Sequence, residues 1–112
     1  MSELAAEDAK LLALARQARS RIQASEGAAV RDDTGRSYSG ASVSVGSLHL
    51  TALELAIAQA IAAGASDIES AVVVTAQGGV DATSLAAIVS TATPLHICSP
   101  SGEVVASTIV EP

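Results

Sequence analysis

The stretch TALELAIAQAIAAG, residues 51–64, decides the fold. Thr51, followed three positions later by Glu54, is a capping-box signature: the Thr hydroxyl accepts from an early backbone N–H, and the Glu carboxylate reaches back to the N-cap. The pattern predicts a helix that begins at Thr51, continues to Ala63 and ends at Gly64. Because apolar side chains cover most of its circumference, we expect it to be buried on more than one side, as a central helix or at a subunit interface.

Strand and helix signals alternate on both sides of this helix. A 3.6-residue apolar period predicts a helix over 3–24, and Asp32-Asp33-Thr34-Gly35 predicts a hairpin turn. The remaining predicted elements are strands over 28–31, 36–40, 70–75, 95–98 and 104–107, an extended piece over 41–45, a loop over 46–50, a short helix over 82–90 and a tail over 108–112. This order is typical of a three-layer α/β/α sandwich around a mixed five-stranded sheet.

Length and composition favour one domain over residues 1–112. Of the residues, 49% are hydrophobic but only 1% are aromatic, so the core is built from Ala, Val, Leu and Ile. The apolar stretches end before the roughly 18 to 20 residues that a bilayer span needs, and the acidic Glu3, Glu7 and Asp8 argue against a signal peptide. Cys98 is the only cysteine, which excludes an internal disulfide framework. We expect a cytoplasmic protein.

Charge is distributed unevenly. The net charge is −6, and all six basic residues lie within the first 36 positions. Nucleic-acid binding requires a basic face that releases counterions from phosphates, and only the first predicted helix can supply one. We therefore predict no nucleic-acid partner and no membrane association.

Several local strings resemble the small cytidine deaminases. GAAV (27–30), DDTGR (32–36) and YSGA (38–41) are similar to the family's V-G-A-A-L strand, D-G hairpin turn and G-x-N-V-E strand. Residues 51–64 look like its buried helix, which begins C-A-E-R, although the connection over 46–50 is shorter than in the family. The resemblance covers nearly the whole chain and implies the cytidine deaminase-like fold and homo-oligomers formed through this helix.

The resemblance also shows where the family's chemistry belongs. In these enzymes three Cys or His side chains hold zinc, which activates a water, and a Glu two residues after the first ligand moves protons. Thr51 stands at the first ligand and Leu53 at that Glu, while Asp81 and Ser84 replace the two Cys of P-C-x-x-C. A Thr hydroxyl is a poor zinc ligand and Leu carries no proton, so we predict no zinc, no other cofactor and no catalytic residue.

Substrate contacts are altered in the same way. Ala24 replaces the aromatic residue of the family's F-x-V-G string, and Ser42 and Ser44 replace the Asn and Glu that hold the ribose. The resemblance thus implies a vestigial pocket formed by Ala24, Ser42, Ser44, Thr51, Leu53, Asp81 and Ser84.

We interpret the chain as a catalytically inactive cytidine deaminase-like protein with a structural, interaction or regulatory role, including weak nucleoside binding. The alternative is an active nucleoside deaminase or other hydrolase with an atypical site in the same cleft. The expected partner is a second copy, in a dimer or tetramer, and a different protein partner and a small-molecule ligand stay open.

Several further residues could bind a metal or an anion or act as nucleophiles, but each also has a purely structural interpretation. His96 and Cys98 share a strand face and offer an N/S pair to a metal, with His49 and Asp81 as further candidates, but zinc sites need three or four ligands. Gln77-Gly78-Gly79 suits an anion nest, yet no cation is near in sequence and a plain turn is favoured. We assign the hydroxyls of Ser42, Ser44, Ser47, Thr51, Thr83 and Ser84 to caps and turns, and expect Asp32 and Asp33 to face solvent.

Overall fold

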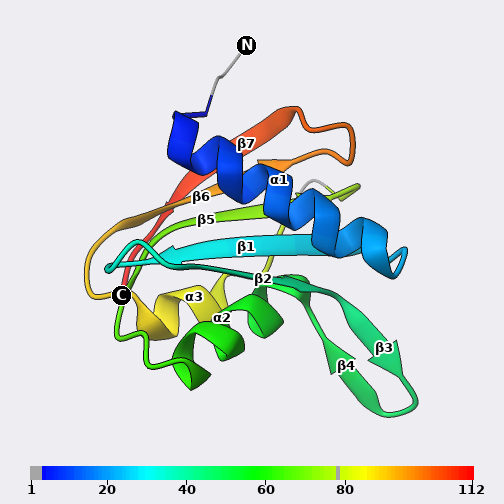
Figure 1. Cartoon of the computed structure of the whole chain (residues 1–112), viewed down its shortest axis with the longest axis horizontal. Coiled ribbons are helices and arrows are strands. Elements are labelled where there is room, and N and C mark those ends of the chain that lie inside the picture. The colour runs from blue at the N-terminus through cyan, green and yellow to red at the C-terminus, as the bar shows by residue number, and fades with distance from the viewer. Residues whose placement is uncertain (1–3, 78) are drawn as a thin grey trace.

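A mixed five-stranded sheet forms the centre of the molecule (Figure 1). The computed structural model describes residues 4–77 and 79–112. In the strand order β2-β1-β5-β6-β7, the β5–β6 pair is parallel and the other pairs are antiparallel. The strands are β1 (Glu26–Asp32), β2 (Ser37–Ala41), β5 (Ile68–Thr75), β6 (Thr93–Cys98) and β7 (Val104–Val110). The predicted sheet is confirmed.

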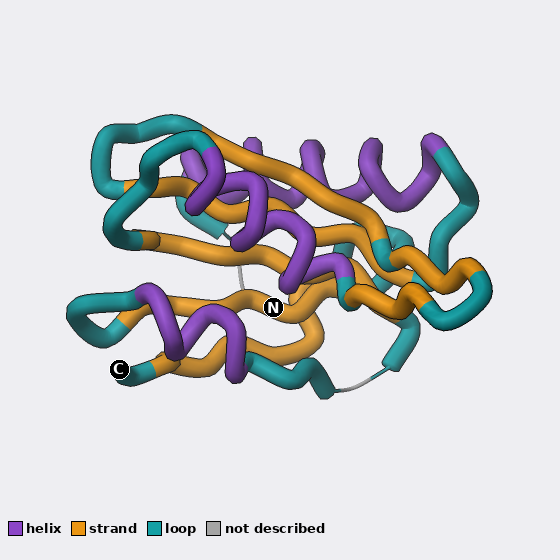
Figure 2. Tube along the Cα trace, turned by 90° about the horizontal axis from the view of Figure 1, so that it is seen from below, coloured by secondary structure: helices purple, strands orange, loops and turns teal. Residues whose placement is uncertain are grey.

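Helices cover both faces of this sheet. Helix α1 (Ala6–Arg21) crosses one face, and α2 (Ala52–Ala62) and α3 (Thr83–Ile88) pack on the other (Figure 1). Seen from below, α2 and α3 lie side by side (Figure 2). The arrangement is the predicted three-layer α/β/α sandwich. Within the described residues, no helix is both long and apolar enough to cross a bilayer.

Strand β5 separates two apolar clusters. Val72 and Val74 pack with Leu11 and Ala15 of α1, whereas Val73 packs with Leu53 and the rest of the α2–α3 layer. Successive side chains of a strand point to opposite faces, so an uninterrupted valine run is what a strand covered on both faces requires. The main core therefore lies on both sides of β5.

Residues 41–50 depart from the prediction. The predicted extended piece over 41–45 contains the end of β2 and all of β3 (Val43–Val45), but the predicted loop over 46–50 is wrong for β4 (Leu48–Leu50). The two short strands form an antiparallel hairpin that projects from the main sheet (Figure 1). Gly46, at φ +57°, supplies the positive φ that a two-residue hairpin turn requires. Each strand has only three residues, which is too short for the alternating pattern to be recognised.

Element ends also differ from the prediction. The predicted tail is wrong for residues 108–110, because β7 continues to Val110, which pairs with Thr93. Helix α1 spans 6–21 and α3 spans 83–88, so both are shorter than predicted. Residues 1–3 and Gly78 of the predicted Gln77-Gly78-Gly79 turn lie outside the described residues.

Helix α2 is not buried on more than one side within the single chain. Ala52, Leu53, Ala56, Ile57 and Ala60 are buried, but Ile61, at the flank of this buried face, is 54% exposed. The burial follows the helical period, because the face turned to the sheet and to α3 meets other side chains.

A polar cluster joins α1 to the sheet. Asp8 Oδ1 accepts from Ser70 Oγ at 2.8 Å and lies 3.2 Å from Arg31 Nη1, while Asp8 Oδ2 lies 3.3 Å from His96 Nε2. The other ring nitrogen, His96 Nδ1, lies 2.8 Å from Ser107 Oγ. Both His96 nitrogens therefore have partners in the fold.

Cys98 shares the α1 face of the sheet with this cluster, as predicted, but it belongs to the apolar core. It is 0% exposed, and burial raises the pKa of its thiol, so the thiol stays neutral. Of the His96–Cys98 pair considered from the sequence as metal ligands, His96 thus makes polar contacts and Cys98 is a buried core residue.

Candidate functional site

A cleft of about 330 Å³ opens between the β3–β4 hairpin, the start of β1 and the N-terminus of α2. We call it the hairpin cleft. Its lining includes Ser42, Ser44 and Thr51 from the predicted pocket, and also Ser25, Glu26, Val43, His49, Leu50, Glu54 and Gln77. The structure therefore brings together three of the seven predicted residues.

The N-terminus of α2 is closed by the predicted capping box. Thr51 Oγ1 accepts from the Glu54 backbone N–H at 3.0 Å, and Glu54 Oε1 accepts from the Thr51 N–H at 2.8 Å. Both side chains thus stabilise the first turn of the helix. At the mouth of the cleft, the hydroxyl and the carboxylate are already engaged with the backbone.

Leu53 does not line the hairpin cleft. It is 1% exposed and belongs to the core cluster with Ala56, Ile57 and Leu85. Leu53 lies on the same face of the helix as Ala56 and Ile57, three and four residues later, and that face is turned to the sheet. Among the predicted pocket residues, Leu53 is the most buried.

Asp81 and Ser84 lie at the start of α3, outside the lining of the cleft. Asp81 Oδ1 accepts from the Thr83 hydroxyl at 2.6 Å and from the Thr83 N–H at 3.0 Å, and these bonds hold the pKa of Asp81 below its usual value. Ser84 Oγ is buried and has no hydrogen-bond partner among the described residues. Asp81 thus forms a turn before α3, and Ser84 lies in the first turn of that helix.

Ala24 is half-buried in the connection between α1 and β1, and the cleft lining begins with the next residue, Ser25. The Ser25 and Ser42 hydroxyls lie 3.0 Å apart, and Ser42 Oγ accepts from the Glu26 N–H at 3.1 Å. Ser42 therefore joins the start of β1 to the end of β2.

His49 is a cleft residue that the sequence analysis did not place there. Its Nδ1 lies 2.9 Å from Ser44 Oγ, and the two residues are cross-strand partners in the β3–β4 hairpin. Since residues 46–50 were predicted as a loop, no strand register was available to pair them. A two-residue Gly46-Ser47 turn between short apolar-polar-apolar triplets is the signal that identifies this pair.

Metal binding depends on the donors that the chain offers. Among the described residues, no group of three or more His, Cys, Asp or Glu side chains is arranged to hold a metal ion. Thr51 and Asp81 already accept hydrogen bonds from their own helix ends.

Comparisons with known proteins agree with the architecture. A family model described as cytidine deaminase-like matches residues 4–102. The fold is similar to the 1.6 Å crystal structure of cytidine deaminase from Burkholderia pseudomallei, with a TM-score of 0.75 and 21% identity over 90% of this chain and 91% of that one. No curated protein gives a significant match to the chain.

Proposed function

The chain belongs to the cytidine deaminase-like family, and from that premise we propose that it is a catalytically inactive member with a structural, interaction or regulatory role. We place it in the cytoplasm as a homo-oligomer whose hairpin cleft binds a small polar ligand of the nucleoside class weakly.

The burial of Leu53 carries this proposal. By resemblance, Leu53 occupies the position of the Glu that moves protons in the active enzymes, and here the side chain is 1% exposed in an apolar cluster. The nearest carboxylate in sequence, Glu54, is folded back onto the Thr51 N–H. A proton-transfer group must reach the reacting atoms, and neither side chain is positioned to do so.

The donor set at the family's zinc position does not fit zinc. Thr51 and Ser84 offer alcohols, which stay protonated near neutral pH, and Asp81 is the one carboxylate. The Thr51 oxygen caps α2, and Asp81 Oδ1 binds Thr83. These donors therefore do not form a zinc site.

The hairpin cleft supports ligand binding without catalysis. Its volume of about 330 Å³ lies within the range of small-molecule sites. Ser42, Ser44 and Gln77 provide neutral hydrogen-bonding groups that suit sugar hydroxyls and base edges.

Self-association is supported by exposed apolar side chains on α2 and the hairpin. Ile61 is 54% exposed, Val45 is 71% exposed and Leu48 is 54% exposed. Burial of such side chains in an interface is favourable because it removes apolar surface from water. A protein partner on the same surface fits the interaction role equally well.

Metal analysis combined with a deamination assay on cytidine and deoxycytidine tests the inactivity. We expect no turnover and substoichiometric zinc. Stoichiometric zinc together with turnover would overturn the proposal.

A thermal-shift titration with nucleosides tests the ligand role, because a ligand that binds only the native state raises the melting temperature. We expect a small rise that Ser42→Ala and Ser44→Ala abolish and that Ser101→Ala, an exposed serine in the β6–β7 turn, leaves unchanged. Identical responses in all variants would contradict a site in the hairpin cleft.

The Ser44–His49 contact favours a second candidate, a hydrolase that uses the hairpin cleft. His49 Nδ1 lies within hydrogen-bonding reach of the Ser44 hydroxyl, as a general base beside a nucleophile must. An ester-hydrolysis assay separates the two candidates. Turnover that Ser44→Ala and His49→Ala both abolish supports the hydrolase, and its absence supports the inactive role.

A further inference from the structure

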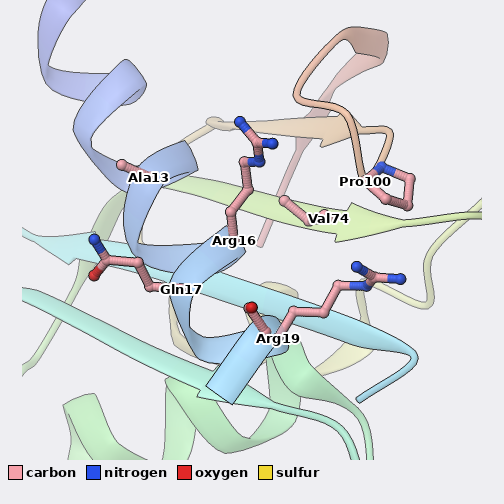
Figure 3. A pocket seen from close by; sticks show the side chains of 7 residues that line it. Ala13, Arg16, Gln17, Arg19, Val74 and Pro100 are labelled. Atoms are coloured by element: carbon pink, nitrogen blue, oxygen red, sulfur yellow. The ribbon is translucent and has the colours of Figure 1, made fainter. Parts of the chain in front are cut away.

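A second cavity, of about 440 Å³, lies between α1, the C-terminal end of the central strand β5 and the β6–β7 turn (Figure 3). We call it the arginine pocket. Its lining is Ala13, Arg16, Gln17, Arg19, Ser20, Val74 and Pro100. These residues differ from those of the hairpin cleft, so the arginine pocket is a separate feature of the molecule.

Positive charge is concentrated in this pocket. In Figure 3 the side chains of Arg16 and Arg19 extend from successive turns of α1 on either side of Val74, with Pro100 opposite. The described lining residues carry two guanidinium groups and no carboxylate. In a chain with a net charge of −6 and only six basic residues, this grouping is distinctive.

Within residues 4–77 and 79–112, neither pocket arginine forms an ion pair with a carboxylate. Among the described residues, the arginine that forms ion pairs is Arg31, with Asp8 and Glu69. Arg19 Nε donates to the Ser25 carbonyl at 3.4 Å, a long bond to an uncharged group. The remaining donors of Arg16 and Arg19 are available to an anion.

The guanidinium of Arg16 lies against the β6–β7 turn. A Cβ atom added at Gly102, where φ is +97°, would lie 3.1 Å from Arg16 Nη1, so the guanidinium packs directly against the turn. Two bonds of 2.8 Å, from the Gly102 N–H to the Ser99 carbonyl and from the Ser99 N–H to the Glu103 carbonyl, close this turn. The closed turn therefore forms one wall of the pocket, and the Arg16 guanidinium lies beside it.

The C-terminal carbonyls of α1, which would repel an anion, are partly satisfied. The Arg19 carbonyl accepts from the Ala24 N–H at 2.9 Å, and the Ser20 carbonyl accepts from the Gln23 N–H at 3.3 Å. Gln17 and Ser20 add neutral donors at the pocket wall. The local environment thus favours negative charge despite the helix end.

We propose that the arginine pocket binds the phosphate group of a small phosphorylated metabolite. Two guanidinium groups match a doubly charged oxyanion, because each presents parallel N–H donors to two oxygens. At roughly 30 Å³ per water, the pocket has room for more than ten waters. The cavity is therefore larger than a phosphate ion needs, and the remaining volume accommodates the esterified part of the ligand. This site is independent of the function proposed for the hairpin cleft.

NMR titration of the full chain at low ionic strength tests the proposal. The probes are inorganic phosphate, glucose 6-phosphate and glucose, added separately. We expect the sugar phosphate and phosphate to shift the amide resonances of residues 16–20 and of Ser99, Ser101 and Gly102, and glucose to have no effect. Shifts with glucose alone, or no shifts with any probe, would overturn the proposal.

Matched variants distinguish binding in the arginine pocket from nonspecific attraction of the anion to any positive charge on the protein. Arg16→Gln and Arg19→Gln remove one charge inside the pocket, and Arg21→Gln and Arg36→Gln remove one charge from exposed positions outside its lining. We expect the dissociation constant to rise about tenfold for the pocket variants and to change little for the controls. Equal weakening in all four variants would contradict the pocket. Thermal unfolding of each variant verifies that the fold persists.

Discussion

At the scale of single residues, Gly27 shows how closely α1 approaches the sheet. A Cβ atom at this position would lie 2.0 Å from the Ala15 carbonyl oxygen and 2.8 Å from Arg19 Cβ. Ordinary side-chain adjustment cannot relieve a contact with helix backbone, so any side chain here forces α1 away from β1.

We therefore expect Gly27→Ala to lower the free energy of unfolding by about 1–3 kcal/mol, the usual cost of overpacking. The matched control is Gly79→Ala, where an added Cβ meets nothing within 4 Å, and its effect is expected to stay within about 0.5 kcal/mol. Urea unfolding measures both. Equal stability of the two variants would show that α1 moves freely.

Asp32 corrects the expectation that both turn aspartates face solvent. Asp33 is exposed, but Asp32 is 2% exposed and accepts bonds from Thr34, Arg36 and Tyr38. Burial alone would raise the pKa of Asp32, yet the hydrogen bonds to the ionised carboxylate outweigh burial and hold the pKa below its usual value. The Asp32 carboxylate therefore stabilises the hairpin turn through these hydrogen bonds.

This lowered pKa makes stability depend on pH. The unfolded chain binds a proton at Asp32 near pH 3.9, above the folded pKa, so this carboxylate stabilises the fold fully above that pH and progressively less as the pH falls through the folded pKa. Asp67, whose pKa is lowered by bonds from Ser90, acts in the same direction. We expect Asp32→Asn to reduce the loss of unfolding free energy between pH 5 and 3, measured by urea titration. A slope as steep as that of Asp33→Asn would contradict this role.

At the scale of elements, the capping box of α2 accounts for the present role of Thr51. The two reciprocal bonds satisfy N–H groups that no helical carbonyl can reach. Thr51→Ala is expected to lower the unfolding free energy by about 1 kcal/mol, whereas Thr51→Ser, which keeps the acceptor, is expected to retain most of the stability. Chemical denaturation compares the two. An alanine variant as stable as the serine variant would show that the cap is dispensable.

The elements also show which local patterns are sufficient for prediction. The capping box and the valine run of β5 were predicted correctly, because the bonds and alternation involved span only a few residues. In the β3–β4 hairpin, the extended conformation of β3 was predicted, but β4 was wrongly predicted as a loop and the pairing was missed. Its three-residue strands gain their order from pairing with each other and give little signal separately.

At the scale of the whole molecule, the exposed side of α2 is the surface on which self-association is expected. Ile61→Glu is expected to raise the dissociation constant of the oligomer at least about tenfold, since it places a charge in an apolar interface. Val105→Glu is the control, because Val105 is 58% exposed on β7. Sedimentation velocity measures both, and a wild-type chain that is monomeric at every concentration would contradict self-association.

The candidate site was only partly accessible from the sequence. Resemblance identified Ser42, Ser44 and Thr51, which do line the hairpin cleft, but it also grouped them with Leu53, which lies in the core. A position inferred from resemblance specifies a place along the chain. Whether the side chain at that position reaches a cleft depends on its chemistry: an apolar side chain such as Leu53 packs into the core.

The sequence by itself determined the order of elements, the start of α2 and the two-sided burial of β5, because short-range hydrogen bonds and side-chain periodicity encode them. Only the tertiary structure decided that Asp8 meets His96, that Asp32 is buried and that Arg16 and Arg19 share a pocket with Pro100. These contacts join residues that are far apart in the chain or depend on the closure of a turn. Their energies therefore exist only once the layers have packed.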